Sequence, residues 1–153
     1  MTERDVVKYL AIHMQKNYPD AIYRFDLAAD LKLTPGQARR HKMIHPNRGY
    51  ADFFLAEPRG IWRGLYLELK KDGVTIVLKD GTMTKDKHIR EQAMFLERAF
   101  KKGYGASFAV GIKEATTLVD RYMSKNGAVI SPVSIFIDAM KKKAHNEVDE
   151  LPF

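Results

Sequence analysis

Two acidic residues and a lysine near the middle of the chain could bind a metal ion together. Asp52 is followed, after a turn-containing segment, by the tripeptide Glu68-Leu69-Lys70. Two carboxylates about 4 Å apart repel by roughly 4 kcal/mol in a surface-like dielectric, so they must share a proton, stay solvated or bind a cation. Oxygen ligands that leave room for substrate phosphates suit Mg²⁺ or Mn²⁺. Lys70 would then steady an attacking hydroxide or the charge that develops on phosphorus.

The residues around these acids predict two neighbouring strands. Segment 51–56 is a short apolar run that contains Asp52, and the following sequence EPRG carries the Pro and Gly that interrupt a strand. The second run, 61–70, ends in a regular alternation. Its two faces carry, respectively, Leu65, Leu67 and Leu69, and Tyr66, Glu68 and Lys70. If the strands pair, we expect Asp52 to reach the open polar face of the second strand.

The rest of the chain predicts helices and strands that would surround this pair. Apolar periodicity, capping residues and turn residues mark the boundaries. The expected elements are a helix at 2–17, a strand at 21–25, a helix at 36–44, a hairpin or projecting loop at 72–84, helices at 85–102 and 113–123, and a strand at 104–110. We therefore expect an α/β protein with a central mixed sheet flanked by helices. At 153 residues one domain is expected, with a core at about 3–123 and a C-terminal helix and tail at 128–153.

A glutamine on the helix that follows the two strands makes the pattern more specific. Asp52, then Glu68-Leu69-Lys70, then Gln92 resembles the PD-(D/E)XK nuclease superfamily. The sequences GYADFFLAEPRG, GLYLELKK and REQAMFLERAFKKGYGASFAVG are similar to its VRR-NUC branch, and the resemblance extends over about 22–122. Without the family, Gln92 would be only an exposed helix-forming residue. The family usually has Pro where this chain has Ala51, a position that shapes the backbone more than it binds metal.

The resemblance implies a restriction-endonuclease-like fold and a metal-dependent endonuclease that hydrolyses DNA phosphodiester bonds. Asp52, Glu68 and the backbone carbonyl of Leu69 would bind Mg²⁺ or Mn²⁺, Lys70 would position or activate water, and Gln92 would support it. Some superfamily members place a further acid on the first helix, and Glu3 is the candidate here. Glu3 has a second explanation, because an acid is favoured at a helix N-terminus.

The same resemblance implies partners and a setting. Related stand-alone domains are dimeric and favour branched DNA such as Holliday junctions, so a homodimer acting on branched DNA is expected. Phage-type relatives imply the cytoplasm of a bacterial or phage-infected cell. The chain has no apolar run long enough to span a bilayer, its N-terminus lacks the order of a signal peptide, and it has no cysteine. Disulfides and thiolate metal sites are therefore excluded.

The charge balance favours a polyanionic partner. Lys and Arg number 26 against 19 Asp and Glu, which gives a net charge of +7. The residues expected to contact nucleic acid are Arg39, Arg40, Lys42, Arg48, Lys71, Lys85 and Lys87. A solvated basic surface is the alternative explanation. His41 and His45 stand four apart, but they lack the intervening Glu of a zinc-protease motif, so phosphate contact or simple exposure is favoured over a zinc site.

Two other functions fit parts of the sequence. A nucleic-acid-binding module on the same fold would retain the basic surface but not cleave; the intact acidic motif argues against it. A different carboxylate enzyme, such as a glycosidase, would also use paired acids. The basic surface and the neighbouring lysine have no role in that chemistry.

Overall fold

The computed structural model describes residues 1–26, 31–47 and 49–124. The elements found there follow in this order: α1 (Glu3–Asn17), β1 (Tyr23–Phe25), α2 (Pro35–Ile44), β2 (Phe53–Leu55), β3 (Leu65–Lys70), α3 (Lys87–Lys101), β4 (Gly105–Val110) and α4 (Ile112–Met123). Arg48 and the expected C-terminal helix and tail at 128–153 lie outside the described residues.

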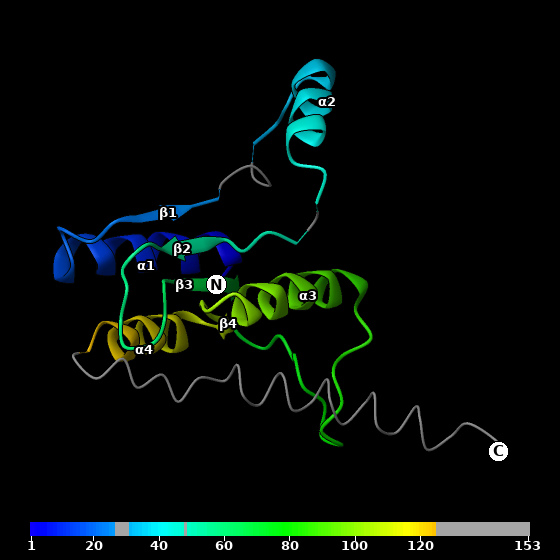
Figure 1. Cartoon of the computed structure of the whole chain (residues 1–153). Coiled ribbons are helices and arrows are strands. Elements are labelled where there is room, and N and C mark those ends of the chain that lie inside the picture. Colours follow the sequence, from blue (N-terminus) through cyan, green and yellow to red (C-terminus); the bar gives the residue numbers. More distant parts are fainter. Residues whose placement is uncertain (27–30, 48, 125–153) are drawn as a thin grey trace.

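The strands form one mixed sheet in the order β1-β2-β3-β4 (Figure 1). β1 pairs with β2 and β2 with β3 in antiparallel fashion, whereas β3 and β4 are parallel. Phe53 lies opposite Leu67, which fixes the register between β2 and β3. The predicted central mixed sheet is therefore confirmed.

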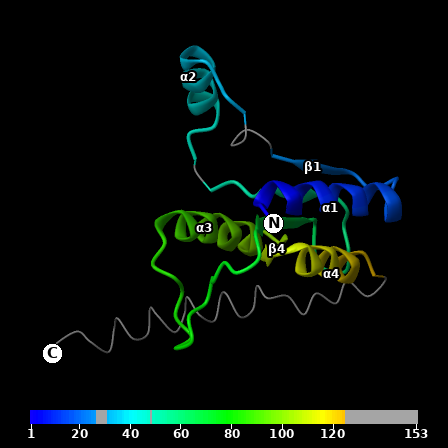
Figure 2. The same cartoon turned by 180° about the vertical axis from the view of Figure 1, so that it is seen from behind.

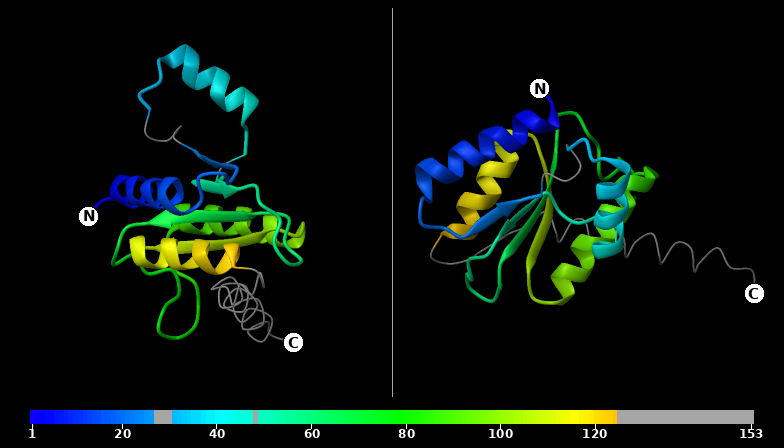
Figure 3. Two further views of the ribbon diagram at one scale, coloured as in Figure 1. Left: turned by 90° about the vertical axis from the view of Figure 1, so that its left-hand side faces the viewer. Right: turned by 90° about the horizontal axis from the view of Figure 1, so that it is seen from above.

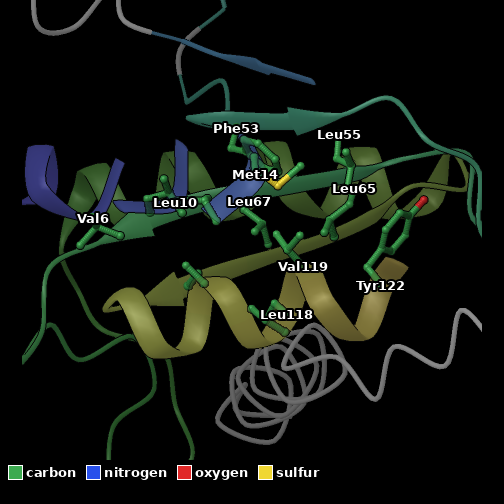
Figure 4. Close-up of a cluster of buried hydrophobic side chains, with 13 residues drawn as sticks. Val6, Leu10, Met14, Phe53, Leu55, Leu65, Leu67, Leu118, Val119 and Tyr122 are labelled. Carbon is green, nitrogen blue, oxygen red and sulfur yellow. The ribbon is translucent and has the colours of Figure 1, made fainter. Parts of the chain in front are cut away.

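Helices cover both faces of this sheet. Figure 3 shows α1 and α4 on one face and α3 on the other, and Figure 2 shows α1 and α4 side by side. The leucines of β3 point toward α1 and α4, where Leu67 lies in one buried cluster with Leu10 and Val119 (Figure 4). Each such fully buried side chain contributes about 1.5–3 kcal/mol of hydrophobic stabilisation. The predicted alternation of β3 is thus confirmed on its apolar face.

The sequence had suggested that the other face of β3 is open to solvent, but in the structure this face is covered. The apolar stripe of α3, including Ala93 and Leu96, packs against Phe108 of β4 on this side. Glu68 is only 2% exposed and Lys70 only 8% exposed. The expectation of a displayed polar patch is wrong, because segments distant in sequence cover the charged face of the strand.

Both central strands are shorter than predicted. β2 begins at Phe53 because the N–H of Leu69 donates to the side chain of Asp52, at 2.9 Å, instead of to a backbone carbonyl of the ladder. β3 begins at Leu65 because Arg59 and Trp62 exchange backbone hydrogen bonds with each other and form a separate turn. A side-chain hydrogen bond therefore replaces ladder pairing before β2, and a local turn replaces it before β3.

The connection between β3 and α3 is a loop rather than a regular hairpin. Within this connection, one isolated antiparallel bridge is described, and it joins Val77 to Met83. Met83 is buried, and Val74 and Ile76 pack against the cluster under α3. The helix begins at Lys87 instead of residue 85, because the Asp86 side chain caps it by accepting the N–H of Ile89.

The helix α2 stands apart from the layers of the molecule (Figure 1). It begins at Pro35, one residue before the predicted range of 36–44, with a capping box between Thr34 and Gln37. None of its side chains is buried. We refer to segment 31–47, which carries α2, as the arm. No helix among the described residues has the length and apolarity needed to cross a membrane.

Candidate active site

Asp52 and Glu68 meet on the face of the sheet that α3 covers. Since Phe53 pairs with Leu67 in an antiparallel ladder, the next step of the register sets Asp52 opposite Glu68. Their side chains are close enough for a hydrogen bond between the two carboxyl groups. The structure therefore brings the two acids together, as the sequence predicted.

The position of Asp52 is fixed from both sides. Its Oδ2 accepts the backbone N–H of Leu69 at 2.9 Å, and its backbone carbonyl accepts the N–H of Asp26 at 2.8 Å. Gly49, three residues earlier, has a φ of +82°, and a Cβ there would lie 2.6 Å from the carbonyl oxygen of Glu91. This close approach to the backbone of α3 requires glycine and sets the path of the chain into the site.

Gln92 reaches Glu68 from α3. Its Nε2 donates to Glu68 Oε1 at 2.6 Å. The second oxygen of the carboxyl group, Oε2, and the amide oxygen of Gln92 are buried without a hydrogen-bond partner in the described part of the chain. Buried oxygens without a donor are unfavourable, and a cation or an ordered water normally satisfies them. The unpartnered oxygens therefore indicate where a ligand to this site would bind.

Lys70 lies on the same side of the strand as Glu68, two residues on. Its Nζ is 3.6 Å from Glu68 Oε1 and 3.8 Å from Glu3 Oε1 at the start of α1. Glu3 is about half exposed, and it lines an open pocket of about 380 Å³ together with Met1, Thr2 and Lys71. The lysine is thus held between a buried acid and a surface acid, next to an opening to solvent.

The environment of the two acids changes their protonation. Burial raises the pKa of Glu68 well above its ordinary value, and the nearby Asp52 carboxylate raises it further. Burial also raises the pKa of Asp52, against the lowering effect of its hydrogen bonds with Glu68 and the Leu69 N–H. In the absence of a metal ion the pair therefore holds a proton at neutral pH, with Glu68 as its main carrier.

The donors available here fit a hard divalent cation. They are the carboxylates of Asp52 and Glu68, both of which supply oxygen ligands. Among residues 1–26, 31–47 and 49–124 no group of three or more His, Asp or Glu side chains is placed to hold a metal ion. A cation at this site would therefore depend on water and substrate oxygens to complete its ligands, as Mg²⁺ commonly does.

The basic residues expected to contact nucleic acid are distributed over three places. Arg39, Arg40 and Lys42 are exposed on the arm, away from the acid pair, and His41 and His45 lie beside them with ring centroids 5.2 Å apart. Lys71 is exposed next to the open pocket, whereas Lys85 and Lys87 are exposed at the start of α3. The remaining candidate, Arg48, is outside the described residues.

The sequence reasoning missed a cluster of aromatic rings on this face of the sheet. Its members are Tyr50, Phe54, Tyr66, Phe95 and Tyr104. One signal was present in the sequence: Tyr50 precedes Asp52 by two residues, just as Tyr66 precedes Glu68. Because alternate residues of a strand share a face, Tyr66 lies on the same side of β3 as Glu68, and the Tyr50 ring contacts Tyr66 there.

Comparison with known proteins supports the fold. A solved structure described as "VRR_NUC domain protein" superimposes with a TM-score of 0.55 and 25% sequence identity, over 82% of this chain and 91% of that chain. No protein-family model matches the chain, and no curated protein matches it. The mixed four-stranded sheet flanked by helices is consistent with a restriction-endonuclease-like fold, and the similarity supports the resemblance to the VRR-NUC branch.

Proposed function

We propose that this protein is a metal-dependent endonuclease that hydrolyses DNA phosphodiester bonds. The observation that carries the proposal is the juxtaposition of Asp52 with buried Glu68, whose Oε2 lacks a partner among the described residues. Two further observations support it: the ammonium of Lys70 lies 3.6 Å from Glu68, and the solved structure that resembles the chain is described as a VRR_NUC domain protein.

The metal would be Mg²⁺ or Mn²⁺, held by Asp52, Glu68 and the backbone carbonyl of Leu69. When bound, such an ion lowers the pKa of its water and polarises the scissile phosphate. The hydrogen bond from the Leu69 N–H orients Asp52, and the amide of Gln92 orients Glu68, so neither acid has to reorganise when a ligand arrives.

Lys70 would act on the phosphate side of the reaction. Its ammonium favours hydroxide over neutral water as the attacking group and stabilises negative charge that develops on phosphorus. Glu3 contacts this lysine rather than the buried acid, so we assign Glu3 to holding Lys70 in place instead of binding metal directly. Lys70 is buried, whereas Glu3 is about half exposed and lines the open pocket.

DNA is the proposed partner because the chain carries a net charge of +7 and six of the basic residues expected to contact nucleic acid are exposed: Arg39, Arg40, Lys42, Lys71, Lys85 and Lys87. A homodimer that acts on branched DNA, including four-way junctions, extends the proposal on the strength of the VRR-NUC resemblance. Sedimentation of the free protein tests the dimer. A comparison of cleavage rates on a four-way junction and on a duplex of the same sequence tests the preference for branches.

The nuclease proposal is tested by incubating supercoiled plasmid and a four-way junction with the protein in Mn²⁺, in Mg²⁺ or in EDTA. Nicking that requires the metal and disappears in Asp52→Ala and Lys70→Ala is the expected result. Circular dichroism of each variant confirms that the fold is retained. A protein that binds both DNAs but never nicks them would instead be a non-catalytic binding module, and the proposal would fail.

A further inference from the structure

The aromatic cluster beside the acids is only partly used by the core. Tyr66, Phe95 and Tyr104 pack against the buried cluster under α3, but Tyr50 and Phe54 do not belong to that cluster. Tyr50 is 51% exposed, and its ring centroid lies 4.8 Å from that of Phe95. The outer rings therefore extend an aromatic surface from the core to solvent.

The rings are held in fixed orientations. Phe54 stacks on Tyr66 with a centroid distance of 4.4 Å and an interplanar angle of 21°, whereas Tyr50 meets Tyr66 edge-on at 90°. Burial and a hydrogen bond with Tyr50 raise the pKa of Tyr66, so the Tyr66 phenol stays neutral. Fixed, uncharged rings lose little conformational entropy when a flat ligand stacks on them.

The surface is adjacent to the proposed catalytic residues. Tyr66 and Glu68 are two residues apart on β3, which sets their backbones roughly 6–7 Å apart on one face. Tyr50 bears the same relation in sequence to Asp52. A flat group on these rings would therefore lie about one nucleotide away from a phosphate bound at the acids.

We infer that Tyr50, with Phe54 and Tyr66 behind it, forms a stacking platform for an unpaired nucleobase next to the cleaved phosphate. The inference rests on the proposed nuclease function and deepens it, because it assigns the substrate class: DNA with a single-stranded segment at the site. Bases within a duplex are stacked on each other and do not present a free face, whereas the bases of a single strand stack on exposed aromatic side chains. The net charge of +7 complements the backbone of such a strand.

The test compares two labelled DNA probes in EDTA, where no cleavage occurs. One is a duplex that carries a single-stranded flap, and the other is the same duplex without the flap. Tyr50→Leu keeps an apolar side chain against Phe95 but removes the flat ring, and Tyr50→Phe keeps the ring. Tyr9→Leu on α1, where Tyr9 is 48% exposed, is the matched control.

Stacking on one base predicts that Tyr50→Leu weakens binding of the flap probe by roughly 5- to 100-fold. Tyr50→Phe and Tyr9→Leu should stay within about twofold of the original protein, and binding of the plain duplex should change equally little. A 2-aminopurine base in the flap should lose fluorescence on binding to the original protein but not to Tyr50→Leu. Thermal unfolding of each variant shows that the fold is retained.

Three results would overturn the inference. Flap binding could be independent of Tyr50, or Tyr50→Leu could weaken binding of both probes equally. Tyr50→Leu could also dissociate a protein oligomer without loss of flap binding. The last result would assign the rings to contact between copies of the chain. Cleavage in Mn²⁺ is measured separately, so a protein that nicks DNA but ignores Tyr50 refutes the platform alone. A protein that stacks the flap base but never nicks refutes the nuclease function.

Discussion

Asp52 and Glu68 face each other across β2 and β3, and the Leu69 N–H bonds to Asp52 at 2.9 Å. Asp52 therefore has two roles. One of its oxygens accepts a backbone hydrogen bond, and its negative charge contributes to the proposed metal site. These roles can be separated. An asparagine keeps an acceptor for the Leu69 N–H but removes the charge.

We expect Asp52→Asn to retain the fold and to lose metal-dependent nicking. The loss should exceed the roughly 100-fold effect that is typical of removing an outer partner of a metal ligand. Plasmid nicking in Mn²⁺, together with thermal unfolding in EDTA, measures both properties. A variant that is as active as the original protein would exclude Asp52 from the metal site.

Glu68 should make the metal-free protein less stable at higher pH. Burial and the neighbouring Asp52 raise its pKa from the ordinary 4.5 to about 10, so the folded state binds more protons than the unfolded state between these pH values. The free energy of unfolding therefore falls as pH rises through the window between the ordinary and the raised pKa. In EDTA, the melting temperature should fall between about pH 5 and about pH 8, each 1 kcal/mol corresponding to about 2–4 °C.

Glu68→Gln is the matched variant for this effect. It keeps the size of the side chain and removes the titrating group, so its melting temperature should depend less on pH and exceed that of the original protein near pH 8. An identical pH profile in the two proteins would show that Glu68 ionises normally in the folded state.

Binding of Mn²⁺ should release a proton. The pair holds a proton that a divalent cation displaces, so the apparent affinity should increase with pH, by up to about tenfold per pH unit for one proton. Calorimetric titrations in buffers with different ionisation enthalpies measure the number of protons released. Glu68→Gln should bind the ion more weakly and release none, whereas equal affinity at all pH values would contradict the coupled acid pair.

Gln92 should act through Glu68. Gln92→Met keeps the length of the side chain but cannot donate the 2.6 Å hydrogen bond. We expect a loss of roughly 10- to 100-fold in Mn²⁺ affinity or nicking rate, as is typical when a partner of a metal ligand is removed. Met94→Ala is the control on the same helix, because Met94 is 61% exposed. Equal effects of the two substitutions would point to α3 stability rather than to the site.

The basic residues of the arm should contribute to DNA affinity through phosphate contacts. Replacing Arg39, Arg40 and Lys42 together by Gln should reduce the slope of log affinity against log salt by about 2.7, at about 0.9 per phosphate contact. The melting temperature should not change, since all three side chains are exposed. The control with the same change in charge replaces Lys8, Lys16 and Lys113 by Gln. An equal effect of both triple variants would mean that net charge alone attracts DNA.

The pairing of the two acids was predictable because it depends on local rules. Strand alternation fixes the face of Glu68, and the turn after residue 56 returns the chain beside Asp52. The burial of Glu68 and Lys70 was not predictable in the same way. It depends on α3 and the start of α1, whose packing on β3 no local pattern specifies.

The aromatic cluster illustrates the same limit. Tyr50, Tyr66 and Phe95 are ordinary residues of a loop, a strand and a helix when each is considered alone. Their contacts appear only when the strand register and the packing of α3 are known. The strand ends were misplaced for a related reason, since a side-chain acceptor at Asp52 and the turn between Arg59 and Trp62 compete with the ladder.

The arm leaves and rejoins the sheet at adjacent points, because the N–H of Asp26 bonds to the carbonyl oxygen of Asp52 at 2.8 Å. This hydrogen bond joins the two chain segments that flank the arm, and no side chain of α2 is buried in the core. Such a segment can be exchanged as a module. Under the proposed function, we expect that exchanging α2 for another helix between these two points changes DNA affinity and leaves the acid pair unchanged.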